Sequence, residues 1–149
     1  MKLDPTVAGY TMLLLLALVA LAEWLAPWHD LSERGCRLGY VYDGDTVEID
    51  CGSETMTARI VGLDTPETKE PGCAAEAELG AKATARLREL VKARPAKMDS
   101  VGYDKYGRVL AELQLGGEDV ADILTREGLA VRYDGSARVD WCKRLEAGR

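Results

Sequence analysis

The sequence predicts an α+β fold that is mainly β barrel: a five-stranded barrel with two to three helices, preceded by an N-terminal hydrophobic helix. Short segments in which apolar and polar residues alternate, typical of half-buried strands, occur at five places after residue 36. A segment with apolar residues at helical spacing separates the third of these from the fourth, and another helical segment follows the fifth. The 149 residues suffice for one such domain and an N-terminal appendage.

Residues 1–34 are predicted to be a signal peptide or membrane anchor plus a linker. Val7 to Ala22 carry no charge, and this block is slightly short of the roughly 20 residues that cross a bilayer. Ala20-Leu21-Ala22 has the small-x-small form that signal peptidase cuts. A cleaved signal, an uncleaved membrane anchor and a buried core helix are three readings of this block. The first two place the domain outside the cytoplasm, either secreted, periplasmic or anchored facing outward.

The cysteines favour the same location. Cys36, Cys51, Cys73 and Cys142 contain no C-x-x-C pair. Cys36 and Cys51 lie equally far from the turn dipeptide Asp43-Gly44, so an antiparallel hairpin closed there brings them face to face. Cys73 and Cys142 are then left to pair, which would pin the C-terminal tail to the start of the long helix. The alternative is four free thiols in a cytosolic protein.

The predicted domain, residues 35–149, has the element order βββ-α-ββ-α followed by an irregular tail. Its expected strands are 37–43, 45–50, 55–63, 96–103 and 108–115. The long helix is expected from Ala74 to Lys92, and the second helix starts after Gly117 and stops at Gly128. Five short strands with one helix between the third and fourth are typical of a small barrel of the OB type.

Composition excludes several kinds of chemistry. The only histidine is His29, inside the appendage, so the predicted domain holds none for a Ser-His pair, a zinc site or a histidine base. The net charge of −6 argues against a protein that coats DNA. Acid–base chemistry therefore falls to carboxylates, Lys, Tyr or Cys.

Three polar segments carry residues suited to chemistry on a phosphate ester. They are Asp43-Gly44-Asp45-Thr46, then Leu63-Asp64-Thr65-Pro66-Glu67-Thr68 directly after a strand with Arg59, and Asp104-Lys105-Tyr106-Gly107-Arg108. Each alone has a structural interpretation. The first is a common hairpin turn, the second could start a helix with Thr65 as N-cap, and the third is a polar turn between strands.

Taken together, the three segments resemble the staphylococcal nuclease (thermonuclease) family. Its signature is a D-G-D-T turn, a strand arginine followed by D-T-P-E-T, and D-K-Y-G-R, all present here in that order. The resemblance covers about residues 37–133 and includes the Arg126-to-Ala130 run. The family fold, a five-stranded OB barrel with helices, agrees with the pattern of elements.

The resemblance implies a calcium site and a catalytic group. The carboxylates of Asp45 and Asp64 and the backbone carbonyl of Thr65 would bind Ca²⁺, and an all-oxygen site suits a hard cation. Glu67 would act as general base or orient the attacking water. Arg59 and Arg108 would grip the phosphate through paired N–H bonds and stabilise its charge as the bond breaks.

The resemblance also implies substrate contacts. Lys105 and Tyr106 match family positions that contact a terminal phosphate of bound nucleotide. Tyr133 either stacks on a base or packs against the barrel. Three features depart from the family: a shorter loop from Thr68 to Cys73, four extra cysteines, and no long C-terminal helix.

The expected function is a calcium-dependent nuclease that lies outside the cytoplasm, either secreted, periplasmic or membrane-anchored facing outward. It is expected to hydrolyse DNA and RNA with little sequence preference and to leave 3′-phosphate ends. Nucleic acid is the expected partner, with the membrane as a second one where the N-terminal segment stays uncleaved, and the expected oligomeric state is a monomer. The alternative is a non-catalytic nucleic-acid- or protein-binding OB-fold module of the cell envelope, in which the motifs only hold turns together.

Overall fold

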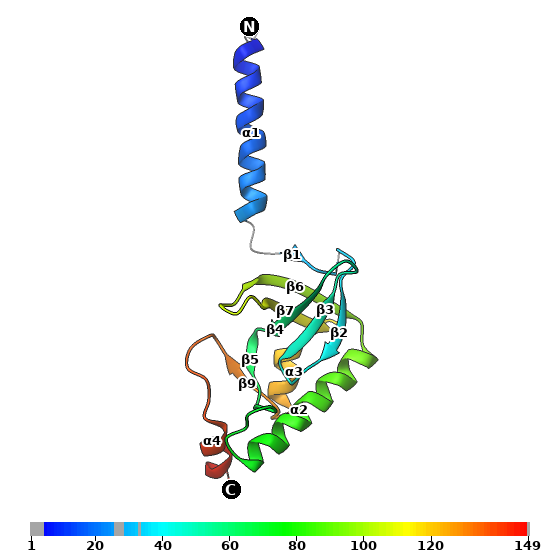
Figure 1. Ribbon diagram of the computed structural model, residues 1–149, viewed down its shortest axis with the longest axis vertical. Coiled ribbons are helices and arrows are strands. Elements are labelled where there is room, and N and C mark those ends of the chain that lie inside the picture. The colour runs from blue at the N-terminus through cyan, green and yellow to red at the C-terminus, as the bar shows by residue number, and fades with distance from the viewer. Residues whose placement is uncertain (1–4, 26–28, 33, 149) are drawn as a thin grey trace.

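The computed structural model describes residues 5–25, 29–32 and 34–148, and it shows the expected mixture of helices and strands (Figure 1). The strands are β1 (His29–Asp30), β2 (Arg37–Val41), β3 (Thr46–Asp50), β4 (Thr55–Ile60), β5 (Gly62–Asp64), β6 (Ala96–Tyr103), β7 (Val109–Leu115), β8 (Glu118–Asp119) and β9 (Val131–Tyr133). The helices are α1 (Pro5–Leu25), α2 (Ala74–Ala93), α3 (Val120–Arg126) and α4 (Trp141–Ala147).

The five longer strands form a curled half-barrel, which confirms the predicted fold class. Their order is β6-β7-β4-β3-β2, with β4 and β7 parallel and the other neighbours antiparallel. The short strands β1 and β8 add to β6 and β7, and β5 pairs with β9 in a separate two-stranded sheet. Because β4 and β7 lie side by side, the strand that carries Arg59 adjoins the one that begins after Arg108.

Apolar side chains on the inner faces of these strands build the core. Burial alternates along β7, where Val109, Ala111, Leu113 and Leu115 are all buried. Leu87 of α2 belongs to the same buried cluster. So do the four apolar residues of α3 that are buried, Val120, Ala121, Ile123 and Leu124. Burying one such aliphatic side chain contributes about 1.5–3 kcal/mol, so this continuous cluster is what fixes the barrel and the loops attached to it.

The third predicted strand, 55–63, is in fact two strands that turn apart at Val61. Gly62 has a φ of 82°, a left-handed conformation that favours glycine. The backbone N–H of Val61 donates to the carbonyl of Ala111 at 3.0 Å. The turn takes β5 off the main sheet to pair with β9, and it is β5 that ends at Asp64.

Two stretches outside the predicted elements are ordered parts of the domain. The tail, expected to be irregular, forms β9 and α4. At the other end, β1 pairs with β6, and Leu31 is buried in the core. The folded domain therefore includes residues that the sequence assigned to the linker, and His29 belongs to its sheet. Residues 26–28 and 33 of that linker lie outside the described residues.

Both predicted disulfides are present. Cys36 bonds Cys51, and Cys73 bonds Cys142, so none of the four is free. The second joins residues 69 apart in the sequence, and by chain-entropy arguments closing such a loop stabilises the fold by about 4 kcal/mol. This bond fixes α4 against the start of α2.

The hydrophobic N-terminal block forms α1, which stands apart from the other elements in Figure 1. Its described apolar side chains, such as Leu14 and Leu15, are exposed. Across the residues that the structure describes, none of the helices combines the length and the apolar character that a membrane crossing requires.

Candidate active site

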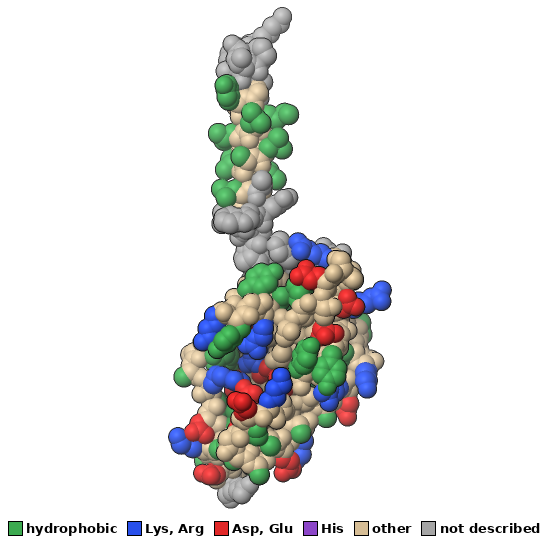
Figure 2. All heavy atoms as spheres, viewed as in Figure 1, with side chains coloured by type: hydrophobic (Ala, Val, Ile, Leu, Met, Phe, Trp, Pro, Cys, Tyr) green, Lys and Arg blue, Asp and Glu red, His purple; other side chains and the backbone are tan. Residues whose placement is uncertain are grey.

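A pocket of about 420 Å³ opens at the side of the half-barrel. Its lining residues are Tyr42, Asp43, Asp45, Thr46, Thr57, Arg59, Glu67, Lys69, Arg108 and Arg138. Basic and acidic side chains gather together on this part of the domain surface (Figure 2). Four residues predicted from the three motifs thus line one cavity: Asp45, Arg59, Glu67 and Arg108. Two more predicted residues, Asp64 and Thr65, contact these lining residues.

The D-G-D-T turn holds Asp45 through a set of local hydrogen bonds. The backbone N–H of Asp45 donates to Asp43 Oδ1 at 3.1 Å, and Thr46 Oγ1 donates to Asp45 Oδ1 at 2.9 Å. A Cβ on Gly44 would lie 2.8 Å from a Thr65 side-chain carbon and 2.9 Å from the Ala83 Cβ. Glycine is therefore required here for close packing, and it brings the turn against both the Thr65 loop and α2.

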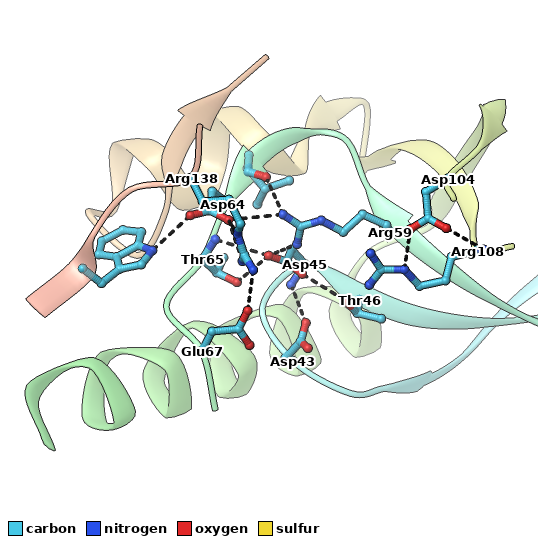
Figure 3. Close-up of polar contacts among 12 residues, drawn as sticks. Asp43, Asp45, Thr46, Arg59, Asp64, Thr65, Glu67, Asp104, Arg108 and Arg138 are labelled. Carbon is cyan, nitrogen blue, oxygen red and sulfur yellow. Dashed lines mark hydrogen bonds and ion pairs between the residues drawn. The ribbon is translucent and has the colours of Figure 1, made fainter. Parts of the chain in front are cut away.

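Two aspartates from different motifs meet at the Arg59 guanidinium. Asp45 and Asp64 are only 4% and 0% exposed. Arg59 forms an ion pair with Asp45 Oδ2, and its Nη2 lies 3.4 Å from Asp64 Oδ1 (Figure 3). Thr65 donates from its backbone N and its Oγ1 to the same Asp45 Oδ2, at 3.3 and 2.9 Å. Burial, followed by the positive charge of Arg138, lowers the pKa of Arg59.

Glu67 lies on an irregular loop, so the interpretation of this segment as a helix start is wrong. Residues 65–72 contain no helix, and α2 begins at Ala74. The buried Glu76 accepts from the backbone N–H groups of Glu67 and Gly72, at 3.3 and 2.8 Å. A Cβ on Gly80 would lie 2.8 Å from the Pro66 carbonyl oxygen. The first turns of α2 thus fix the loop that presents Glu67.

The D-K-Y-G-R turn organises Arg108. Asp104 accepts from the backbone N–H of Tyr106 and of Arg108, and its Oδ2 accepts from Arg108 Nε at 2.7 Å. Although desolvation acts in the opposite direction, these bonds lower the pKa of Asp104. Lys105 Nζ and Arg108 Cζ lie 5.0 and 5.7 Å from the centre of the Tyr106 ring. Lys105 and Tyr106 are exposed beside Arg108 but do not line the pocket.

Tyr133 lies in a neighbouring, more apolar pocket of about 350 Å³ that shares Arg59 with the first. Its ring lines this pocket together with Ile60 and Leu110, and its hydroxyl donates to the carbonyl of Ser136 at 2.8 Å. The structure therefore places Tyr133 near the predicted catalytic residues without assigning it to the same cavity. Stacking on a base stays a prediction.

Two site residues were missed by the sequence reasoning, Arg138 and Trp141. Arg138 contacts both Asp64 and Glu67, and Trp141 Nε1 donates to Asp64 Oδ2 at 3.1 Å (Figure 3). One signal could have found them. The predicted bond between Cys73 and Cys142 requires the residues just before Cys142 to lie near the loop that follows Asp64.

The donor set fits a hard cation. Asp45, Asp64 and Thr65 offer only oxygen ligands, which calcium and magnesium prefer. The three carboxylates of Asp45, Asp64 and Glu67 do not form a cluster with ligand atoms all within 4.8 Å of one another. Within the described residues such a cluster occurs only at Cys73, Glu76 and Cys142, whose sulfurs are already joined. By the chemistry of their oxygen atoms, the two aspartates and Thr65 therefore suit a cation.

An OB-type half-barrel with carboxylates and guanidinium groups lining one pocket is the class of protein suited to bind a phosphate ester together with a cation. Sequence comparison then gives the family. The sequence model described as "Staphylococcal nuclease homologue" matches residues 57–146, more than half of the chain. The chain belongs to this family, which confirms the resemblance found in its motifs.

Relatives with assigned names are similar over about the same stretch. The SPbeta prophage-derived endonuclease YokF and the endonuclease YncB of Bacillus subtilis are each 36% identical over 91 residues, 59% of this chain and 30% and 43% of theirs. A thermonuclease of Staphylococcus intermedius is 37% identical over 91 residues, 60% of this chain and 54% of its own. The matched part thus spans between 30% and 54% of the length of these relatives.

Proposed function

We propose that this protein is a calcium-dependent nuclease that hydrolyses phosphodiester bonds of DNA and RNA with little sequence preference, leaving 3′-phosphate ends. The observation that carries the proposal is the single pocket lined by Asp45, Arg59, Glu67 and Arg108. The names of the relatives, endonuclease and thermonuclease, support the reaction class. Their names do not bear on the metal or on the product ends, which rest on the motif resemblance and the oxygen donor set.

In this proposal each side chain has a distinct task. Asp45, Asp64 and the Thr65 carbonyl would hold the cation, which when bound supplies positive charge to the phosphoryl oxygens. Arg59 and Arg108 bind the scissile phosphate from two sides and stabilise the charge that develops on it. Glu67 accepts a proton from the attacking water or orients that water.

The outer contacts of the substrate are assigned to exposed residues around the pocket. Lys105 and Tyr106 lie beside Arg108, where a cation and a phenol can bind a neighbouring phosphate. Tyr133, which lines a pocket together with Arg59, would stack on a base. None of these contacts reads a base edge, which agrees with little sequence preference.

Incubation of the full oxidised chain with single-stranded DNA, with calcium or with a chelator in excess, tests the proposal. Cleavage is expected with calcium and is expected to stop with the chelator, because the cation neutralises the phosphate. Cleavage that persists in chelator contradicts the metal role. Binding without cleavage by folded protein contradicts the enzyme and supports the binding module of the cell envelope instead.

We also propose that the domain acts outside the cytoplasm as a monomer. Two disulfides in a small domain are typical of oxidising compartments, and the uncharged N-terminal block suits export as a signal or as an anchor in the membrane. The intact mass of the mature protein under non-reducing conditions checks this proposal. A full-length mass with all four thiols free contradicts it.

A further inference from the structure

Some of the residues that line the pocket were not predicted from the motifs. Of these, Arg138 makes the most extensive contacts. Its Nε and Nη2 each lie 2.7 Å from Asp64 Oδ1, and its Nη1 lies 2.5 Å from Glu67 Oε1. The guanidinium thus bridges the carboxylate expected to hold a cation and the carboxylate expected to serve as base (Figure 3). Charge-assisted bonds of this geometry are among the strongest that side chains form.

One of the oxygen atoms that Arg138 contacts, Asp64 Oδ1, is an atom that a divalent cation would need. Asp64 Oδ1 accepts from Arg138 and lies 3.4 Å from Arg59 Nη2, while Asp64 Oδ2 accepts from the Trp141 indole. A cation at about 2.3–2.6 Å from Oδ1 and a guanidinium at 2.7 Å from the same atom repel each other strongly. Arginine cannot relieve this repulsion by losing its proton, so its side chain has to move.

We infer that Arg138 is a built-in counter-cation of this site, which competes with calcium for Asp64 and thereby sets the calcium affinity of the protein. The inference rests on the proposed calcium site and goes beyond it, because it assigns a role to a residue outside the three motifs. Arg138 raises the calcium concentration at which the site fills.

The tail anchors the backbone next to Arg138 and leaves the Arg138 side chain able to move. The bond between Cys73 and Cys142 and the hydrogen bond from Trp141 to Asp64 hold the backbone beyond Arg138 against the site. Trp141 itself is buried. The Arg138 side chain, by contrast, is 47% exposed, so it has open space to swing into while its backbone stays anchored.

Electrostatics favour a tight but replaceable contact. Although burial acts in the opposite direction, the bonds to Asp64 and Glu67 raise the pKa of Arg138, which stays charged throughout the range where proteins are folded. Burial, followed by this positive charge of Arg138, lowers the pKa of Arg59. Two guanidinium groups already share Asp64, and a divalent ion that replaces one of them keeps the carboxylates neutralised.

Calcium titration of the full oxidised chain by calorimetry, after removal of bound metal, tests the inference without any nuclease assay. Arg138→Gln is expected to bind calcium at least about tenfold more tightly than the unchanged protein, because a competing charge-assisted contact is gone. Arg86→Gln is the matched control. Arg86 also pairs with carboxylates, Glu127 and Glu89, but does not line the pocket, so its affinity is expected to stay within twofold.

A second variant covers the case in which the glutamine protein does not fold. Arg138→Lys keeps the charge without the planar fork, and it is expected to bind calcium with an affinity between those of the unchanged protein and the glutamine variant. Thermal unfolding gives an independent readout. Calcium is expected to raise the Tm of Arg138→Gln more than that of the unchanged protein, since tighter binding to the folded state stabilises it more.

The outcomes separate this inference from the proposed function. Calcium binding that is equal or weaker in both Arg138 variants than in the unchanged protein overturns the counter-cation role and leaves the calcium site standing. An absence of calcium binding in the unchanged protein and in both variants overturns the two together.

Discussion

Arg108→Ala is expected to lower kcat for DNA cleavage by about a thousandfold, the effect of removing one preorganised donor from a charged transition state. Arg108 is the better of the two arginines proposed to bind the scissile phosphate for this test. Arg59 is also the ion-pair partner of two buried aspartates, so its loss leaves buried charge unpaired and confuses stability with catalysis. Arg108 pairs with Asp104 in an exposed turn and is 35% exposed. Steady-state kinetics on single-stranded DNA measure the effect.

The matched control is Arg86→Ala. Arg86 is 34% exposed and bonded to a carboxylate, Glu127, yet it lies on α2 outside the pocket. Its substitution is expected to leave kcat within twofold. A loss below tenfold in Arg108→Ala, or an equal loss in both variants, contradicts the assignment of Arg108 to the transition state.

Glu67→Gln is expected to lower kcat by about 10²–10⁴-fold, the usual contribution of general acid–base catalysis. Glutamine keeps the shape of the side chain and an oxygen that can accept from Arg138, so the loop and the pocket should persist. Nucleotide binding is therefore expected to stay nearly unchanged. Equilibrium binding of a nucleoside monophosphate, measured beside the kinetics, separates the two effects.

Glu70→Gln is the control for this second variant. Glu70 follows Glu67 on the same loop, is exposed and does not line the pocket. Its kinetics are expected to match those of the unchanged protein. Collapse of nucleotide binding in Glu67→Gln would instead mark Glu67 as a structural residue of the loop.

Local sequence patterns predicted the elements whose signals are local. The helix from Ala74 to Lys92 matches α2 almost to the residue, because its apolar stripe buries Ala83, Leu87 and Leu90. The hairpin symmetry about Asp43-Gly44 predicted the bond between Cys36 and Cys51. These features depend on periodicity and turn chemistry, which a single sequence displays directly.

Apart from the bond between Cys73 and Cys142, features that depend on distant partners were not predicted. The tail strand β9 is three residues long and forms only because β5 pairs with it, and α4 buries little besides Trp141. The break at Val61 follows from its hydrogen bond to Ala111 on β7. Such pairings leave no pattern in the residues themselves.

The candidate site shows the same division. The four residues Asp45, Arg59, Glu67 and Arg108, which line one pocket, could be predicted from the motifs. Each of them belongs to a segment with a distinct local signature. Arg138 has no such signature. It reaches Asp64 and Glu67 because the second disulfide folds the tail back.

The proposed function requires that one cation and one phosphate bind in the same pocket. The most direct test is to measure how each of these ligands changes the affinity for the other. Calcium affinity of the full chain is measured by calorimetry with and without a saturating deoxynucleoside monophosphate, which contains no diester to be cleaved. We expect the nucleotide to tighten calcium binding at least about fivefold. By thermodynamic linkage, calcium is expected to tighten nucleotide binding by the same factor. Independent binding of the two ligands, with neither affinity changed by the other, would contradict it.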